Sequence, residues 1–251
     1  MQVEIRERAV EEIEPLHMLY REEAHCQLIR DAYWRRKFFD VFTAEVDSRV
    51  AAYGAVANQH DAGRLMEFYT LPEFQAEEME LFRRLLPVCR ATHIEAQTNL
   101  PRMLRLLEAG AIGIETQNFL FADAFTSGLV CPEGDGILRR REPPGDIHNE
   151  WILESDGKEA ASGGFLTHYN PPYADIYMKV EEPHRRRGFG SYLVQELKRM
   201  CYDNGKLPSA RCNAENAASR RTLEKAGLGV CAELRVGEIA PAMLSARPSR
   251  P

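Results

Sequence analysis

A glycine- and arginine-rich loop, Arg-Arg-Arg-Gly-Phe-Gly at residues 185–190, lies between an apolar segment at 174–180 and a helix-like run that begins at Ser191. Glycines allow the backbone to approach a ligand and to turn consecutive N–H groups toward it. The start of the following helix adds unpaired N–H donors and a partial positive charge. The order strand, loop, helix therefore predicts a diphosphate-binding loop, although rows of arginines are also common on solvated helix faces.

Net charge and cysteine usage limit the classes of function. The chain of 251 residues has a formal net charge of −6, which argues against a general nucleic-acid or membrane-surface binder. Its six cysteines form no Cys-x-x-Cys pair and no Cys/His spacing suited to zinc, so we expect no metal site. No segment resembles a signal peptide or reaches the length of a transmembrane helix. We therefore expect a cytoplasmic protein with reduced thiols.

The two halves of the chain resemble each other. The segment from Asn99 to Gly110 matches the segment from Asn216 to Gly227 at an offset of 117 residues, with four identities in twelve positions. Upstream, at an offset of 112, two leucines and a cysteine recur: Leu81, Leu85 and Cys89 match Leu193, Leu197 and Cys201. Two amphipathic helices that end at a glycine would also look alike. Because order, spacing and residue type agree, we interpret the pattern as an internal repeat.

The repeat also predicts which half binds a diphosphate. At the offset of 112, carboxylates and an alanine in the first half stand opposite the arginine and glycines of the loop: Glu73 for Arg185, Ala76 for Gly188 and Glu78 for Gly190. Carboxylates repel a diphosphate, and Cβ atoms block a close approach to the backbone. We therefore expect no cofactor site in the first half.

Periodicity and turn residues predict a mixed α/β fold with two domains, at residues 1–127 and 128–251, joined by a Gly-, Pro- and charge-rich linker at 126–146. In the first half we expect strands at 3–8, 41–46, 49–58, 64–69, 93–97 and 116–121, and helices at 11–23, 27–39, 72–89 and 101–109. In the second half we expect strands at 148–155, 160–167, 174–180, 210–213 and 230–236, and helices at 189–202 and 217–226. The second half lacks the two helices that open the first.

The motif Arg185-x2-Gly188-x-Gly190, followed by a helix, a strand, Asn216 and a second helix, resembles the GNAT acyltransferase superfamily over residues 147–240. The first half resembles a degenerate copy, as in tandem GNAT proteins. The resemblance implies two tandem domains, each a twisted, splayed mixed β-sheet flanked by helices. It also implies acetyl-CoA as the cofactor, bound where the fourth and fifth strands of the second domain diverge.

The resemblance implies three groups of cofactor contacts. The backbone of one strand would pair with the pantetheine amides, at Met178, Lys179 and Val180. The loop and the helix start would wrap the diphosphate, at Arg185, Arg186, Arg187, Gly188, Phe189, Gly190 and Ser191. Asn216 and Ser219 would lie near the pantetheine and diphosphate arm. From the residues alone, Asn216 is also a good helix N-cap and Phe189 a good core residue.

Acetyl transfer to an amine needs a base that takes the amine proton and, in many cases, an acid for the leaving thiolate. Asp175, ten residues before Arg185, stands where some family members carry a glutamate base, although an ordinary strand-edge carboxylate would look the same. The family often has a tyrosine acid directly before a Glu-Lys pair, but this sequence has Leu223 there. Tyr177, Tyr192 or solvent would have to replace it, or the thiolate leaves unprotonated.

The turn before the fourth strand of the second half, His168-Tyr-Asn-Pro-Pro-Tyr173, borders the acceptor site in GNAT folds. His168, Tyr169 and Tyr173 are therefore candidate substrate contacts, although Pro-Pro between tyrosines is also ordinary turn chemistry. Because the second half lacks the opening helices, we hypothesise that the first half supplies a wall of the acceptor site.

The function expected from these features is acetyl-CoA-dependent N-acetyl transfer to a primary amine of a small molecule, by direct attack in a ternary complex. Neither nucleic acid nor membrane is an expected partner, and the protein would be a monomer or homodimer. Two alternatives are an acyl-CoA-binding regulatory module with decayed catalysis, which Leu223 favours, and a protein N-acetyltransferase.

Overall fold

The computed structural model describes residues 2–132, 136–141 and 151–245. The chain forms two compact units. The first contains Met1–Gln117 and Glu233–Pro251, and the second contains Asn118–Ala232. The predicted mixed α/β fold is confirmed in both units.

The first unit is a mixed sheet with the strand order β1-β2-β3-β4-β5-β12, in which only β4 and β5 are parallel. Its strands are β1 (Val3–Arg8), β2 (Phe39–Val46), β3 (Arg49–Ala57), β4 (Arg64–Thr70), β5 (His93–Gln97) and the end of β12 (Leu228–Ile239). Its helices are α1 (Val10–Glu22), α2 (Asp31–Arg35), the 3-10 helix η1 (Pro72–Glu77), α3 (Glu78–Cys89), α4 (Pro101–Gly110) and α7 (Pro241–Leu244).

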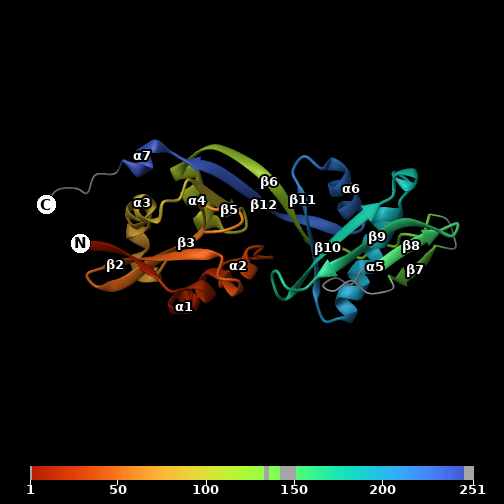
Figure 1. Ribbon diagram of the computed structural model, residues 1–251, viewed down its shortest axis with the longest axis horizontal. Helices are drawn as coiled ribbons and strands as arrows, with labels where there is room; N and C mark the ends of the chain where they lie inside the picture. Colours follow the sequence, from red (N-terminus) through yellow and green to blue (C-terminus); the bar gives the residue numbers. More distant parts are fainter. Residues whose placement is uncertain (1, 133–135, 142–150, 246–251) are drawn as a thin grey trace. The chain divides into compact units, whose positions relative to one another are not determined.

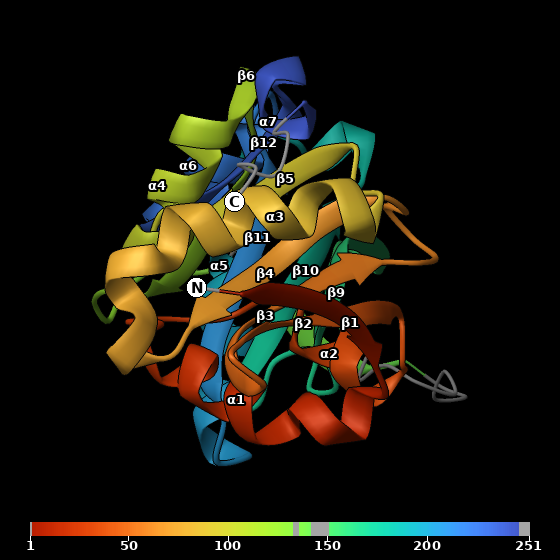
Figure 2. The ribbon, with the colours of Figure 1, turned by 90° about the vertical axis from the view of Figure 1, so that its left-hand side faces the viewer.

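Helices cover both faces of this sheet. Figures 1 and 2 show α3 and α4 on one side of the strands and α1 and α2 on the other. The spacing of apolar residues explains how α3 packs, because four of its side chains lie on one helix face and are fully buried: Leu81, Phe82, Leu85 and Leu86. The first unit therefore has a complete core of its own.

The second unit has the strand order β6-β11-β10-β9-β8-β7, in which only β10 and β11 are parallel. Its strands are the end of β6 (Ala111–Asp123), β7 (Ile137–Arg140), β8 (Trp151–Ser155), β9 (Lys158–Leu166), β10 (Tyr173–Val180), β11 (Leu207–Asn213) and the start of β12. The 3-10 helix η2 (Glu182–His184) precedes α5 (Phe189–Asp203), and α6 (Ala217–Lys225) follows β11. Helix α5 packs on β9 and β10, and α6 lies beside β11 (Figure 1).

Two long strands, β6 and β12, each begin in one unit and end in the other, where they add a strand to its sheet. Residues Asn118–Ala122 of β6 pair with β11 in the second unit, and Leu234–Glu238 of β12 pair with β5 in the first. The chain therefore passes from the first compact unit to the second between residues 117 and 118, and returns between residues 232 and 233. The predicted boundary at 127/128 instead follows the sequence repeat. Such an exchange depends on which strands become neighbours, and this is not a local property of the sequence.

Most predicted elements are present, and two predictions were wrong. The helix expected at 27–39 is only Asp31–Arg35, because the Gln97 side chain bonds to the backbone of the preceding segment. Gln97 Oε1 accepts from Ile29 N at 3.0 Å, and Gln97 Nε2 donates to Gln27 O at 3.0 Å. The linker expected at 126–146 contains the edge strand β7. Residues 133–135, 142–146 and the first three of the strand expected at 148–155 lie outside the described residues.

Candidate cofactor and acceptor site

Strands β10 and β11 begin as hydrogen-bonded neighbours and then separate. Their parallel register runs from Tyr173 opposite Leu207 to Ile176 opposite Ala210 and stops there. Beyond this point, 177–180 pair outward with β9 and 211–213 pair outward with β6. The inner edges of 177–180 and 211–213 therefore face a gap in the ladder. Met178, Lys179 and Val180, the predicted pantetheine contacts, all lie along this gap.

The loop after β10 has the backbone conformation that its glycines allow. Gly188 has φ of +100° and is the N-cap of α5, and Arg186 has φ of +60°. A Cβ at Gly190 would lie 3.0 Å from Val180 Cγ2 and 3.1 Å from Thr222 Cγ2, so the glycine lets α5 approach both elements. In the described part of the chain, no side chain caps the first turn of α5. Its leading N–H groups thus remain available to an anion, supported by the helix dipole.

The predicted diphosphate residues form the end of the loop, at 185–188, and the first turn of α5, at 189–191, and their side chains have different surroundings. The three arginines are exposed. Arg185 Nε donates to Val180 O at 3.3 Å, and the Arg187 guanidinium lies 5.4 Å from the centre of the Phe189 ring. Phe189 and Ser191 are buried, so only their backbone could serve a diphosphate. The interpretation of Phe189 as a core residue is confirmed.

Asn216 caps α6, as its residue type predicted. Its Oδ1 accepts a hydrogen bond from Ser219 N at 3.0 Å. A cofactor contact by Asn216 or Ser219 stays a prediction, and capping does not compete with it because Ser219 Oγ is not part of the cap.

The first unit shows the same divergence of strands, and a hydrogen-bonded ion pair lies at the end of its strand β4. β4 and β5 pair only at Arg64–His93 and Leu65–Ile94. Arg102 donates to Glu78 Oε1 from Nε at 3.0 Å and from Nη2 at 2.8 Å, and also to Thr70 O at 2.8 Å and Glu23 Oε1 at 2.6 Å. By the offsets of the repeat, Glu78 and Arg102 correspond to Gly190 and Ser219. An ion pair thus lies where the second unit has a glycine and a serine.

Asp175, the predicted base, lies on β10 just before the point of divergence. It is 8 % exposed, and its Oδ2 pairs with Arg211 Nε at 3.0 Å. Burial raises the pKa of Asp175 above its ordinary value, and the positive charge of Arg211 opposes part of that effect. A carboxylate with a raised pKa is a better proton acceptor than an exposed one.

The candidate acids have different surroundings. Leu223 is buried in the core of the second unit. Tyr177 alternates with the buried Ile176, so it lies on the same face of β10 as Asp175. Burial raises the pKa of Tyr192, and Glu196 on the same helix adds to the effect, so this phenol holds its proton more firmly than usual.

The predicted substrate turn packs on β11 through a residue that the sequence reading missed. The rings of His168 and Tyr169 lie 4.3 Å apart, and the Arg211 guanidinium lies 5.0 Å from the centre of the Tyr169 ring. Tyr173 begins β10 opposite Leu207. The available signal for Arg211 was a cation between two small residues, Ala210 and Cys212, within a predicted strand.

Residues 2–132, 136–141 and 151–245 contain no group of three or more His, Cys, Asp or Glu side chains placed to hold a metal ion. No helix in these ranges is both long and apolar enough to cross a membrane.

Residues 158–236 match the family model described as "FR47-like protein". The fold is similar to that of a GNAT-family acetyltransferase from Colwellia psychrerythraea, with a TM-score of 0.76 and 16% identity over 96% of this chain and 100% of that one. It is also similar to a tandem GNAT protein from the clavulanic acid biosynthesis pathway, with a TM-score of 0.59 and 12% identity over 96% and 99% of the two chains. No curated protein matches the chain in sequence. The predicted GNAT fold is confirmed.

We predict that Arg102→Ala lowers the free energy of unfolding by about 2 kcal/mol, because it leaves Glu78, Glu23 and the Thr70 carbonyl without a donor. Affinity for acetyl-CoA should stay unchanged. Urea denaturation and calorimetric titration measure the two quantities. Arg105→Ala is the control, since this exposed side chain makes only a 3.5 Å contact with Glu78. Arg102→Ala and Arg105→Ala variants of equal stability would contradict this account.

Proposed function

We propose that this GNAT-fold chain is an acetyl-CoA-dependent N-acetyltransferase that acetylates a primary amine of a small molecule, and that its cofactor binds in the second unit. The observation that carries the proposal is the early end of the β10–β11 ladder at Ile176 and Ala210, next to a loop that leads into an uncapped helix. The unpaired strand edges suit the amides of pantetheine, and the helix start suits a diphosphate.

The residues present fit this cofactor. Backbone groups of Met178–Val180 would pair with its amides, and the first N–H groups of α5 with its diphosphate. The exposed side chains of Arg185, Arg186 and Arg187 would add charge. The bound group supplies a thioester-activated acetyl. The first unit is proposed to lack such a site, since Arg102 and Glu78 form an ion pair at the positions that correspond to Ser219 and Gly190.

The chain's own part in the chemistry is to position the amine and to take its proton. Asp175 is the proposed base, because it is a buried carboxylate with a raised pKa beside the divergence of the strands. A backbone N–H near Met178–Val180 would donate to the oxygen that gains negative charge. Tyr177, on the same strand face as Asp175, is the proposed proton donor to the departing sulfur. Direct attack within a ternary complex depends mainly on proximity.

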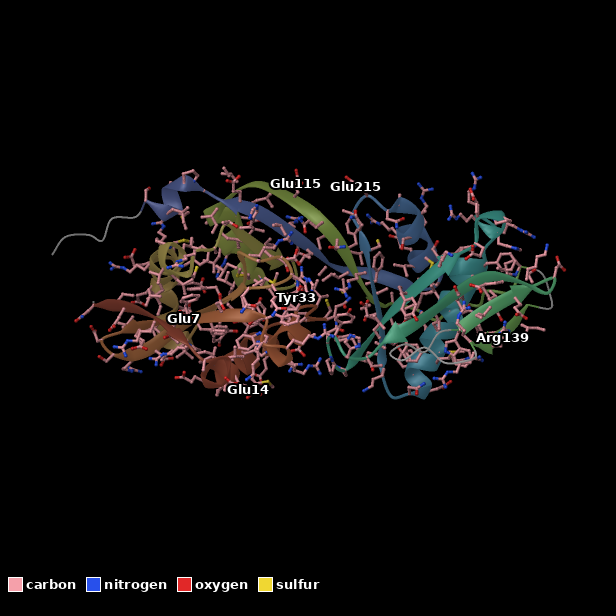
Figure 3. All side chains as sticks on the ribbon, in the orientation of Figure 1. Glu7, Glu14, Tyr33, Glu115, Arg139 and Glu215 are labelled. Atoms are coloured by element: carbon pink, nitrogen blue, oxygen red, sulfur yellow. The ribbon has the colours of Figure 1, made fainter. Side chains whose placement is uncertain are left out.

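A second candidate, an acyl-CoA-binding regulatory module, is favoured by one observation. Leu223, buried in the core, stands where the family often has its acid, so the hydroxyl is absent from α6. Protein acetylation is the third candidate, and the acidic side chains labelled in Figure 3 are exposed, as acidic residues usually are: Glu7, Glu14, Glu115 and Glu215. A screen of amines and peptides with acetyl-CoA, in which release of the free CoA thiol is measured, separates the three candidates.

The diphosphate loop gives a direct test. Arg186→Glu is expected to weaken acetyl-CoA binding roughly 10- to 100-fold, since a charge-assisted contact becomes a repulsion. The side chain is exposed, so the fold should be unaffected. Arg199→Glu, at an exposed position near the other end of α5, is the matched control. Equal affinity of the two variants in calorimetric titration would exclude this loop as the diphosphate site.

The role of Asp175 predicts a pH dependence. The carboxylate accepts a proton only above its own pKa, which burial raises from the ordinary value. With an accepted amine, kcat should therefore fall as the pH drops through this raised pKa, and Asp175→Asn should remove the acidic limb and reduce kcat roughly 100-fold. Rates measured from pH 4 to 9 check this. An unchanged profile in the Asn variant would mean that water or another group is the base.

The absence of a hydroxyl at position 223 can be tested by adding one. If thiolate departure limits the rate, Leu223→Tyr should raise kcat at least several-fold, toward the roughly 100-fold at the low end of general acid–base catalysis. Leu223→Phe controls for the larger ring in this buried position. Equal kcat values for the Tyr and Phe variants would show that protonation of the thiolate does not limit turnover.

A further inference from the structure

Arg211 and Asp175 lie on the face of the second sheet that α5 does not cover. Ala210 and Cys212 belong to the core beneath α5, as do Ala174 and Ile176. Because successive strand residues point to opposite faces, Arg211 and Asp175 both point to the other face.

The contacts of Arg211 leave part of its guanidinium unused. Its Nε pairs with Asp175 Oδ2 at 3.0 Å, and its Cζ lies over the Tyr169 ring, 5.0 Å from the ring centre. Within residues 2–132, 136–141 and 151–245 it has no other ion pair and no other hydrogen-bond partner. Its side chain is 29% exposed, so the two terminal nitrogens can reach a ligand. A planar guanidinium with a free edge is suited to a carboxylate.

Asp175 also has an unused atom. Its Oδ1 is buried and has no hydrogen-bond partner in the described part of the chain. A buried oxygen without a donor is costly, by about 1–3 kcal/mol, so such atoms are rare in purely structural ion pairs. A pair that served only the fold would be expected to satisfy both carboxylate oxygens. Asp175 Oδ1 therefore indicates a missing donor.

The pair stands where a transferred acetyl group would be delivered. The β10–β11 ladder ends at Ile176 and Ala210, the residues next to Asp175 and Arg211. A ligand arm that runs between the separated strands can go no further than this point. Groups just beyond the ladder's end are placed to hold the acceptor, if the proposed function holds.

We infer that the acceptor is an α-amino acid or a similar amine with an adjacent carboxylate: Arg211 binds the carboxylate, and Asp175 Oδ1 receives an N–H of the amine. The inference deepens the proposed function and rests on it. An unused donor edge and an unused acceptor atom belong to one ion pair, and an α-amino-carboxylate presents the complementary acceptor and donor side by side. Tyr169 holds the guanidinium from its face, as a positioning residue.

Matched substrates test the inference. Each amino acid is compared with the amine that lacks its carboxylate: phenylalanine with phenethylamine, tyrosine with tyramine, and lysine with cadaverine, within a panel of the twenty standard amino acids. The wild-type chain should prefer at least one amino acid over its decarboxylated partner by roughly 10- to 100-fold in kcat/KM, the value of a charge-assisted contact.

The variant Arg211→Gln should bring this ratio close to one, mainly through KM of the amino acid. Arg211→Lys, which keeps the charge without the planar fork, should retain part of the preference. The experiment compares the ratio of the two kcat/KM values, because loss of the ion pair also changes the surroundings of Asp175. That change affects the amino acid and its decarboxylated partner alike. Arg199→Gln, at an exposed site on α5, is the matched control and should leave the ratio unchanged.

The outcomes separate the inference from the proposed function. Acetylation of simple amines as fast as of amino acids, or a ratio that Arg211→Gln does not change, overturns the inference and leaves the proposed function standing. Binding of acetyl-CoA without acetylation of any amino acid also overturns it. Failure to bind acetyl-CoA at all contradicts the proposed function itself.

Discussion

The separation of β10 from β11 after Ile176 and Ala210 is the constraint on which the candidate site depends. Parallel neighbours that part leave the backbone groups of their inner edges without a strand partner, although buried N–H and C=O groups are almost always paired. Here β9 and β6 pair only with the outer edges of 177–180 and 211–213. Since β6 follows the last helix of the first half of the sequence, the second unit needs a strand from the preceding half to keep the outer edge of 211–213 paired. The inner edges are left for another partner, which in the proposed complex is the pantetheine arm.

The first unit shares the divergence of strands with the second, although it is proposed to lack a cofactor site. Its strands β4 and β5 part after two residue pairs, yet Glu78 and Arg102 fill the corresponding place with a hydrogen-bonded ion pair. Both side chains are more than four-fifths buried, so the pair is sheltered from solvent screening. Relative to the second unit, glutamate stands for glycine and arginine for serine, and the arginine also pairs with Glu23.

Local features of the fold were predictable from the sequence, and long-range pairings were not. The loop at 185–190 was found because glycines, charge and a helix start are adjacent in the chain. The helix expected at 27–39 was mostly wrong because Gln97, almost 70 residues away, bonds to the backbone of Gln27 and Ile29. Arg211 was missed for the same kind of reason. Its pairing with Asp175, 36 residues earlier, depends on the parallel register and on both residues sharing one sheet face.

In the proposed complex, the Asp175–Arg211 pair would couple recognition to basicity. Without an acceptor, burial raises the pKa of Asp175 while the neighbouring guanidinium opposes the rise. A substrate carboxylate on Arg211 would place a second negative charge near Asp175 and offset that opposition. The affinity of Asp175 for a proton would then increase when an amino acid is bound, at the moment when an amine proton must be accepted. An amine without a carboxylate would meet a weaker base, so the same guanidinium would discriminate in the rate of transfer as well as in binding.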